Sequence, residues 1–136
     1  MKQVITFHSY KGGTGKTTLA ANLAALLAKK GNNVCIVDID VYAPSLHTYF
    51  GDSVQNKIKN TLNDYIVGAC GVDDLLVQVT PIPQMADKGP QSGKIIGCFS
   101  SSKREDILKI EGVKEDKNRM NMLKRFINFR EELIEK

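Results

Sequence analysis

The 136-residue sequence lacks several features that would direct a chain to a membrane or to secretion. No apolar run approaches the ~18 residues that a membrane-spanning helix needs, and the first residues lack the apolar stretch and cleavage site of a signal peptide. Cysteine is scarce: Cys35, Cys70 and Cys98 show no Cys-x-x-Cys spacing and stand among apolar neighbours. We therefore expect a cytoplasmic protein with three buried free thiols.

Most of the chain carries charges of both signs. The net charge is +4, but no arginine occurs before position 104, and from Asp38 onward acidic residues are mixed with the basic ones. A positive balance weakly favours an anionic partner, whereas a nucleic-acid-binding protein usually carries a concentrated basic stripe. The length and the 42% hydrophobic content predict one globular domain.

The distribution of charge divides the chain into two parts. The last 36 residues contain more charged side chains than the first hundred. Residues 1–100 are typical of packed α/β structure. Residues 101–136 are expected to form a polar connection followed by an amphipathic helix.

The first part of the chain predicts a β-α-β unit. Residues 3–8 form a short apolar run typical of a buried strand. Residues 16–30 carry a helical stripe of leucines, and Gly31 is expected to end that helix. Residues 34–37 are entirely apolar and predict a second strand. The leucines of the stripe are Leu19, Leu23, Leu26 and Leu27.

Weaker patterns predict the remaining elements. We expect a helix over 61–70, a strand over 75–79, a proline-containing loop over 80–93 and a buried strand over 94–99. Residues 100–102 are expected to form a turn or a helix cap. The final helix is predicted over 117–135, with one apolar face for core packing. That face would hold Leu123, Phe126, Ile127, Leu133 and Ile134.

The most informative segment joins the first strand to the first helix. Glycines in this position let the backbone approach a polyphosphate, and consecutive N–H groups with the helix N-terminus bind anions. A lysine there would neutralise the β- and γ-phosphates, and a threonine hydroxyl would bind Mg²⁺. The segment reads Tyr10-Lys11-Gly12-Gly13-Thr14-Gly15-Lys16-Thr17-Thr18, with Lys16 as that lysine and Thr17 as that threonine.

This loop resembles that of the deviant phosphate-loop ATPases, whose pattern is K-G-G-x-G-K-[ST]. The family includes the ParA and MinD ATPases, Mrp-type iron–sulfur carriers, the arsenical pump ATPase and the nitrogenase iron protein. The resemblance implies ATP or ADP with Mg²⁺ as ligands, and a three-layer α/β/α, Rossmann-like fold with a mostly parallel sheet. It also implies that Lys11 crosses a nucleotide-dependent homodimer to contact the partner's phosphates; without the resemblance, Lys11 reads as a solvated loop lysine.

Two acidic residues follow the second strand and resemble the switch I segment of that family. The carboxyl end of a strand is where open α/β sheets bind ligands. Asp38 would hold Mg²⁺ through a water molecule, and Asp40 would orient or deprotonate the attacking water. The alternative is that two acids simply end a strand. The Ala43-Pro44-Ser45 turn that follows is similar to that of the Mrp-type and archaeal partitioning-type branches.

One expected segment of the family is missing. No apolar strand ending in a Walker B aspartate follows the final helix. We therefore expect residues 1–136 to be the N-terminal part of a single ATPase domain with an incomplete sheet. Three explanations stay open: a truncated chain, which we favour, complementation by another chain, and a degenerate member that binds nucleotide without hydrolysis.

The resemblance implies three alternative functions. The first is an ATP-dependent dimerising switch in chromosome or plasmid partitioning or in cellular positioning, which would be stimulated by an activator protein. The second is an iron–sulfur cluster carrier, although the Cys-x-x-Cys of that type is absent. The third is a nucleotide-binding module without turnover. Contact with DNA or with a membrane would belong to a longer parent protein and has no support in these residues.

Overall fold

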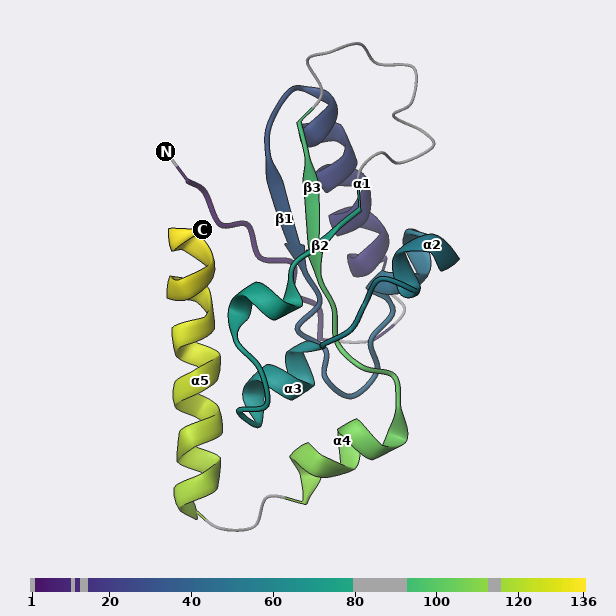
Figure 1. Ribbon diagram of the computed structural model, residues 1–136. Coiled ribbons are helices and arrows are strands. Elements are labelled where there is room, and N and C mark those ends of the chain that lie inside the picture. The colour runs from purple at the N-terminus through teal and green to yellow at the C-terminus, as the bar shows by residue number, and fades with distance from the viewer. Residues whose placement is uncertain (1, 11, 13–14, 80–92, 113–115) are drawn as a thin grey trace.

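A small mixed sheet lies at the centre of the computed structural model, which describes residues 2–10, 12, 15–79, 93–112 and 116–136 (Figure 1). Its strands are β1 (Val34–Val37), β2 (Val77–Gln78) and β3 (Ile95–Cys98), in the order β1-β3-β2. β1 runs parallel to β3, whereas β2 runs antiparallel to it. The described sheet is therefore mixed and not mostly parallel as expected, although the fold is of the α/β class.

Helices connect and cover these strands. The sequence prediction is confirmed for the first helix, for β1 and β3, and for the existence of the final helix. The predicted helix over 61–70 is shorter, and the predicted strand over 75–79 is reduced to β2, because a 3-10 turn occupies the residues before it. The helices are α1 (Lys16–Lys29), α2 (Asp52–Gln55), α3 (Leu62–Ile66), α4 (Arg104–Glu111) and α5 (Asp116–Glu135), with 3-10 turns η1 (Leu46–Tyr49) and η2 (Val72–Leu75).

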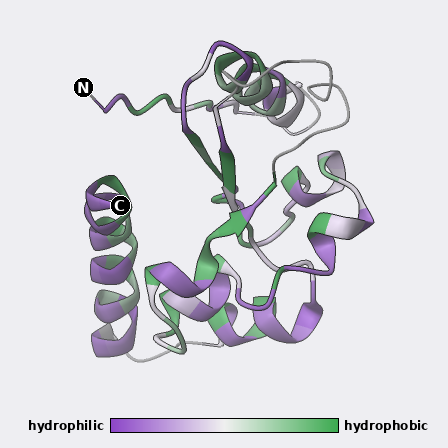
Figure 2. Cartoon of the chain, turned by 45° about the horizontal axis from the view of Figure 1, so that its top comes forward, coloured by the Kyte–Doolittle hydropathy of each residue, from purple (hydrophilic) through white to green (hydrophobic). Residues whose placement is uncertain are grey.

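The apolar side chains of the strands alternate between two clusters. Ile36, Ile95 and Phe99 pack with α1 on one face of the sheet. Cys98 packs with α3 and α5 on the other face, where Leu62 and Phe129 are buried. This alternation follows from the period of two along a strand. Figure 2 shows hydrophobic colour on the strands and a largely hydrophilic α5.

The N-terminal residues do not form the expected strand. Residues 2–9 have no regular secondary structure, and the side chains of Val4 and Ile5 are 55% and 56% exposed. An isolated strand gains little, because its backbone groups need a neighbouring strand for hydrogen bonds. Within the described residues, β1 pairs on one edge only, with β3, and no strand lies beside residues 2–9. The expected β-α-β unit is therefore present only as α1 and β1.

The two long helices bury different faces from those predicted. α1 buries Ala21, Ala24 and Ala28, while Leu19 and Leu26 of the predicted stripe are 59% and 47% exposed. The small alanines let the helix approach the sheet closely. α5 buries Phe129 and leaves Leu123, Phe126 and Ile127 exposed. Core packing of α5 is thus confirmed, but the predicted face is wrong for these three residues.

The polar connection contains structure that the sequence pattern did not indicate. α4 lies within the segment expected to be irregular, with Glu105 and Asp106 in its first turn, where acidic side chains favour a helix N-terminus. The segment predicted as a turn or helix cap at 100–102 has no regular secondary structure, and Ser101 Oγ accepts a hydrogen bond from Lys103 N at 3.1 Å and donates one to Asp106 Oδ2 at 2.6 Å. The predicted loop over 80–93 lies outside the described residues except for Gly93.

Candidate functional site

The described part of the glycine-rich segment ends in a left-handed glycine. Gly15 has φ 82° and ψ 9° and stands immediately before the first residue of α1, Lys16. Positive φ is accessible to glycine without the steric cost that a Cβ brings. Gly12 is also described, whereas Lys11, Gly13 and Thr14 lie outside the described residues. The end of the loop therefore has a backbone conformation that favours glycine directly before the helix.

The N-terminus of α1 has the properties of an anion site. The first N–H groups of an α-helix have no partner within the helix, and the helix dipole places positive potential there. The first turn of α1 contains no acidic residue, and no side chain caps it. Lys16 and Thr17 stand in this turn and are partly buried. These groups suit a phosphate chain and Mg²⁺ chemically.

Asp38 organises the segment that follows β1. Its Oδ2 accepts hydrogen bonds from the backbone N–H groups of Ser45 at 3.2 Å and Leu46 at 3.1 Å, and its Oδ1 accepts one from Asp40 N at 3.1 Å. Its own backbone N–H donates to Cys98 O at 3.0 Å. The carboxylate therefore holds residues 40–46 in a closed turn at the carboxyl end of the sheet.

Asp40 stabilises a smaller turn inside that segment. Its Oδ1 accepts hydrogen bonds from Tyr42 N at 3.2 Å and Ala43 N at 2.9 Å. Aspartate commonly bonds to backbone N–H groups two or three residues ahead in this way. Asp40 is exposed, so its carboxylate also faces solvent.

Ser45 joins the helix side of the site to the strand side. Its hydroxyl lies 3.2 Å from Thr17 Oγ1, and its backbone N–H donates to Asp38. A second contact, between Thr18 Oγ1 and the Tyr49 hydroxyl, joins α1 to η1. The structure thus brings the two predicted magnesium ligands, Thr17 and Asp38, to opposite sides of one serine. It leaves open the placement of Lys11, Gly13 and Thr14.

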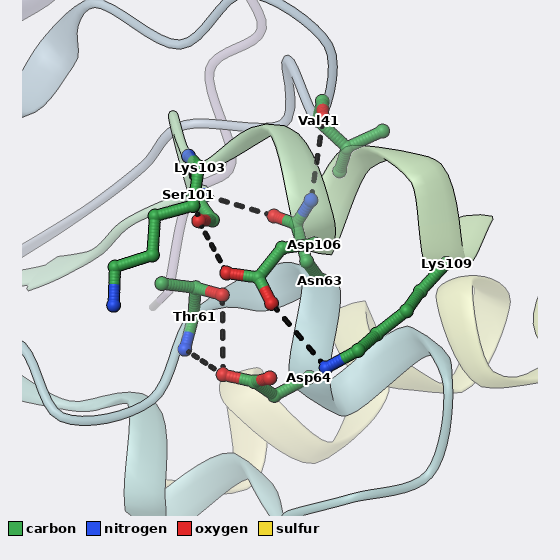
Figure 3. Close-up of polar contacts among 8 residues, drawn as sticks. All are labelled: Val41, Thr61, Asn63, Asp64, Ser101, Lys103, Asp106 and Lys109. Atoms are coloured by element: carbon green, nitrogen blue, oxygen red, sulfur yellow. Dashed lines mark hydrogen bonds and ion pairs between the residues drawn. The ribbon is translucent and has the colours of Figure 1, made fainter. Parts of the chain in front are cut away.

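A buried amide behind the Asp38 segment was not found by sequence reasoning. Asn63 is 2% exposed; its Nδ2 donates to Val41 O at 3.3 Å, and its Oδ1 accepts from Ser101 N at 2.9 Å (Figure 3). Ser100 Oγ donates to Asp38 O at 2.7 Å. These bonds anchor the segment to α3 and to the end of β3. The only sequence signal is the Thr61-x-x-Asp64 spacing of a helix start, which places Asn63 in the first turn of α3.

The cysteines differ from the expected buried set. All three are free thiols, but Cys35 is exposed, Cys70 is half-buried and Cys98 is buried. Cys35 and Cys98 share a hydrogen bond between neighbouring strands, which lowers the pKa of Cys35. The same bond, together with burial, raises the pKa of Cys98. The prediction of burial is therefore wrong for Cys35, because β1 is an edge strand in the described sheet.

The left-handed glycine, the acid-free helix N-terminus and the aspartate-held turn are features that a P-loop NTPase also has. A family model described as ParA: NUBPL iron-transfer P-loop NTPase matches residues 1–92, which is more than half of the chain. The chain belongs to this family. The resemblance stated from Lys11 to Thr17 is thereby confirmed.

Curated relatives include septum site-determining proteins and iron-sulfur cluster carrier proteins. The septum site-determining protein MinD of Thermotoga maritima is 40% identical over 78 residues, which cover 57% of this chain and 28% of that protein. MinD of Bacillus subtilis is 36% identical over 97 residues, 65% of this chain and 35% of that protein. An iron-sulfur cluster carrier protein of Aquifex aeolicus is 51% identical over 51 residues, 38% of this chain and 14% of that protein.

The chain therefore aligns with about a third or less of the length of these three relatives. No solved structure matches this chain. A search of the described helices finds none that is both long and apolar enough to cross a membrane.

Proposed function

We propose that this chain is the nucleotide-binding part of a Mg-ATP-dependent ATPase of the ParA/MinD type. The observation that carries the proposal is Ser45, whose hydroxyl lies 3.2 Å from Thr17 and whose N–H group donates to Asp38. It connects the start of α1 to the carboxyl end of β1, as a phosphate-and-metal site between loop and switch would require. The match of the family model to residues 1–92 supports the same assignment.

In this proposal each residue has a separate task. The N–H groups of Gly12 to Thr18 bind phosphate oxygens, and Lys16 neutralises the β- and γ-phosphates. Thr17 and Asp38 would hold Mg²⁺, since this ion prefers oxygen ligands. The bound metal would neutralise charge on the phosphates. Asp40 orients the attacking water, and Lys11 contacts the phosphates of a partner subunit.

The wider function follows the MinD relatives. We propose a cytoplasmic, ATP-dependent homodimer that acts in partitioning or cellular positioning and responds to an activator protein. Residues 1–136 would be the N-terminal part of one three-layer α/β/α ATPase domain, with residues 101–136 as the polar connection and amphipathic helix. Among the described residues, β1 pairs on one edge only and residues 2–9 have no regular secondary structure, which supports a sheet that needs a further strand.

A second candidate function is iron–sulfur cluster transfer. The description of the family model as an iron-transfer NTPase and the carrier protein of Aquifex aeolicus favour it. Within the described ranges, no group of three or more His, Cys, Asp or Glu residues is placed to hold a metal ion. Anaerobic reconstitution with iron and sulfide distinguishes the two: the carrier function predicts bound iron in stoichiometric amount, and the switch function predicts none.

Isothermal calorimetry with Mg-ATP and Mg-ADP tests the nucleotide site. We expect binding by the unmodified chain and its loss in Lys16→Ala, because Lys16 supplies the positive charge beside the phosphates. Lys29→Ala is the matched control, since it removes an exposed lysine from the last turn of the same helix. Phosphate release measured in parallel separates an ATPase from a module that binds without turnover.

Two results would contradict the proposal. One is equal binding by the unmodified chain and Lys16→Ala. The other is no binding by the unmodified chain while its circular dichroism shows a folded protein.

A further inference from the structure

A cavity lies far along the chain from the phosphate loop. It has a volume of about 920 Å³ and is bounded by α3 and the residues after it, by Lys109 of α4, and by one face of α5. None of its lining residues belongs to the glycine-rich segment, to α1 or to the Asp38 segment. Its size is within the range of small-molecule sites.

The α5 wall of this cavity is polar at helical spacing. Asn121, Arg125, Asn128 and Glu132 succeed one another every three or four residues and all line the cavity. All four side chains are exposed, so the cavity is open to solvent along this face of α5. The amides of Asn121 and Asn128 have no hydrogen-bond partner among the described residues. This face therefore presents free donors and acceptors to the cavity.

Positive charge predominates in the lining. Lys109, Lys124 and Arg125 line the cavity, against the single carboxylate of Glu132. Glu132 accepts a hydrogen bond from the Tyr65 hydroxyl at 2.9 Å. Neither Lys124 nor Arg125 takes part in the ion pairs Lys109–Asp106 and Lys136–Asp73 of the described residues. Unpaired cations that converge on a cavity favour an anionic ligand.

The backbone opposite Arg125 is shaped to admit its guanidinium group. A Cβ at Gly68 would lie 2.9 Å from Arg125 Nη2 and 3.0 Å from Cζ, closer than side-chain atoms normally approach. Gly68 also has φ +85°, which disfavours other residues. The guanidinium therefore packs directly on the backbone at the end of α3. This contact orients Arg125 in the cavity wall. A freely solvated surface arginine has no such contact.

We propose that this cavity is a binding site for a small phosphate-bearing molecule, separate from the nucleotide at the phosphate loop. The planar guanidinium of Arg125 binds phosphate oxygens through two parallel hydrogen bonds. Lys109 and Lys124 add positive charge, and the amides of Asn121 and Asn128 bind the polar groups of the ligand. The proposal does not depend on the function of the phosphate loop.

Calorimetry with inorganic tripolyphosphate tests this site in a Lys16→Ala background, which removes the lysine assigned to the β- and γ-phosphates at the phosphate loop. We expect the Lys16→Ala protein to bind the probe and the further change Arg125→Gln to weaken that binding about tenfold or more, because a bidentate, charge-assisted contact is lost. Arg130→Gln is the matched control: Arg130 is exposed on the same helix and does not line the cavity. It should change the affinity less than about twofold.

Two outcomes would overturn the proposal. If Arg130→Gln weakens binding as much as Arg125→Gln does, the probe responds only to the overall charge of α5. If the Lys16→Ala protein is folded by circular dichroism but binds no tripolyphosphate, the cavity is not a phosphate site. Arg125→Lys gives an independent readout, since it keeps the charge but loses the planar fork; full affinity in this variant would also contradict the assigned geometry. Loss of Mg-ATP binding in Lys16→Ala is a separate result and tests only the phosphate loop.

Discussion

Two apolar runs of similar composition have opposite fates in this molecule. Ile95 in β3 is fully buried, whereas Ile5 in the N-terminal segment is 56% exposed. β3 has a strand on each edge, β1 and β2, and helices contact both faces of the sheet. Residues 2–9 have no neighbouring strand in the described structure. The comparison shows that partner strands, more than apolar composition, decide whether such a run becomes a strand.

The largest expected effect is the difference between two matched substitutions. Ile95→Ala should lower the free energy of unfolding by about 2–5 kcal/mol, because it leaves a cavity in the packed core. Ile5→Ala should change it by less than about 0.5 kcal/mol, because the side chain is already solvated. Urea unfolding followed by circular dichroism measures both values under the same conditions.

This pair also tests whether the exposed segment gains a partner in solution. A cost above about 1 kcal/mol for Ile5→Ala would mean that residues 2–9 bury apolar surface against another element. Concentration dependence of that cost would indicate that a second copy of the chain supplies the surface. Either result would contradict the exposed state described above.

The comparison explains which parts of the fold were predictable. The apolar runs of β1 and β3 and the glycine at the end of α1 are local signals, and these elements form where expected. The buried faces of α1 and α5 were not predictable, since both helices carry more than one apolar stripe. The sequence pattern cannot choose between the alanines of α1 and Leu19 or Leu26, because that choice depends on how closely the helix approaches the sheet.

The residues of the candidate site also divide into a predictable and an unpredictable part. Gly15, Lys16 and Thr17 belong to a contiguous motif, so their placement at the start of α1 was predictable. The bridge from Thr17 through Ser45 to Asp38 depends on two segments that are distant in sequence. Asn63 was missed because a buried asparagine has no local pattern that distinguishes it from a surface one.

The second prediction is Asn63→Ala, which tests how much the buried amide of Asn63 contributes to stability. The change removes the hydrogen-bond partners of Val41 O and Ser101 N, so we expect a loss of about 1–3 kcal/mol in the free energy of unfolding. Asn56→Ala, at an exposed asparagine, is the control and should cost less than about 0.5 kcal/mol. Equal costs for the two variants would show that the buried amide contributes no more than a surface residue.

The last prediction concerns Tyr65, which packs against Phe129 in the same region with ring centroids 5.4 Å apart. Burial and the hydrogen bond that its hydroxyl donates to Glu132 raise the pKa of Tyr65 to about 12 from an ordinary value of 10.0. Between these two pH values the unfolded chain has lost the phenol proton, while the folded chain retains it. The resulting contribution to stability is therefore complete below pH 10 and is lost as the pH rises toward 12.

Tyr65→Phe removes the titrating group and should flatten the fall in stability between pH 10 and pH 12, as measured by urea unfolding across that range. Tyr10→Phe, at a side chain that is 98% exposed, is the matched control and should leave the pH dependence unchanged.

Absorbance of tyrosinate gives an independent measure: the last phenol to ionise in the unmodified chain should be absent from Tyr65→Phe and present in Tyr10→Phe. If both variants show the pH dependence of the unmodified chain, the hydroxyl of Tyr65 is hydrated in solution. In that case water would reach the Tyr65 hydroxyl through the cavity beside α3, although the side chain is only 3% exposed in the structure.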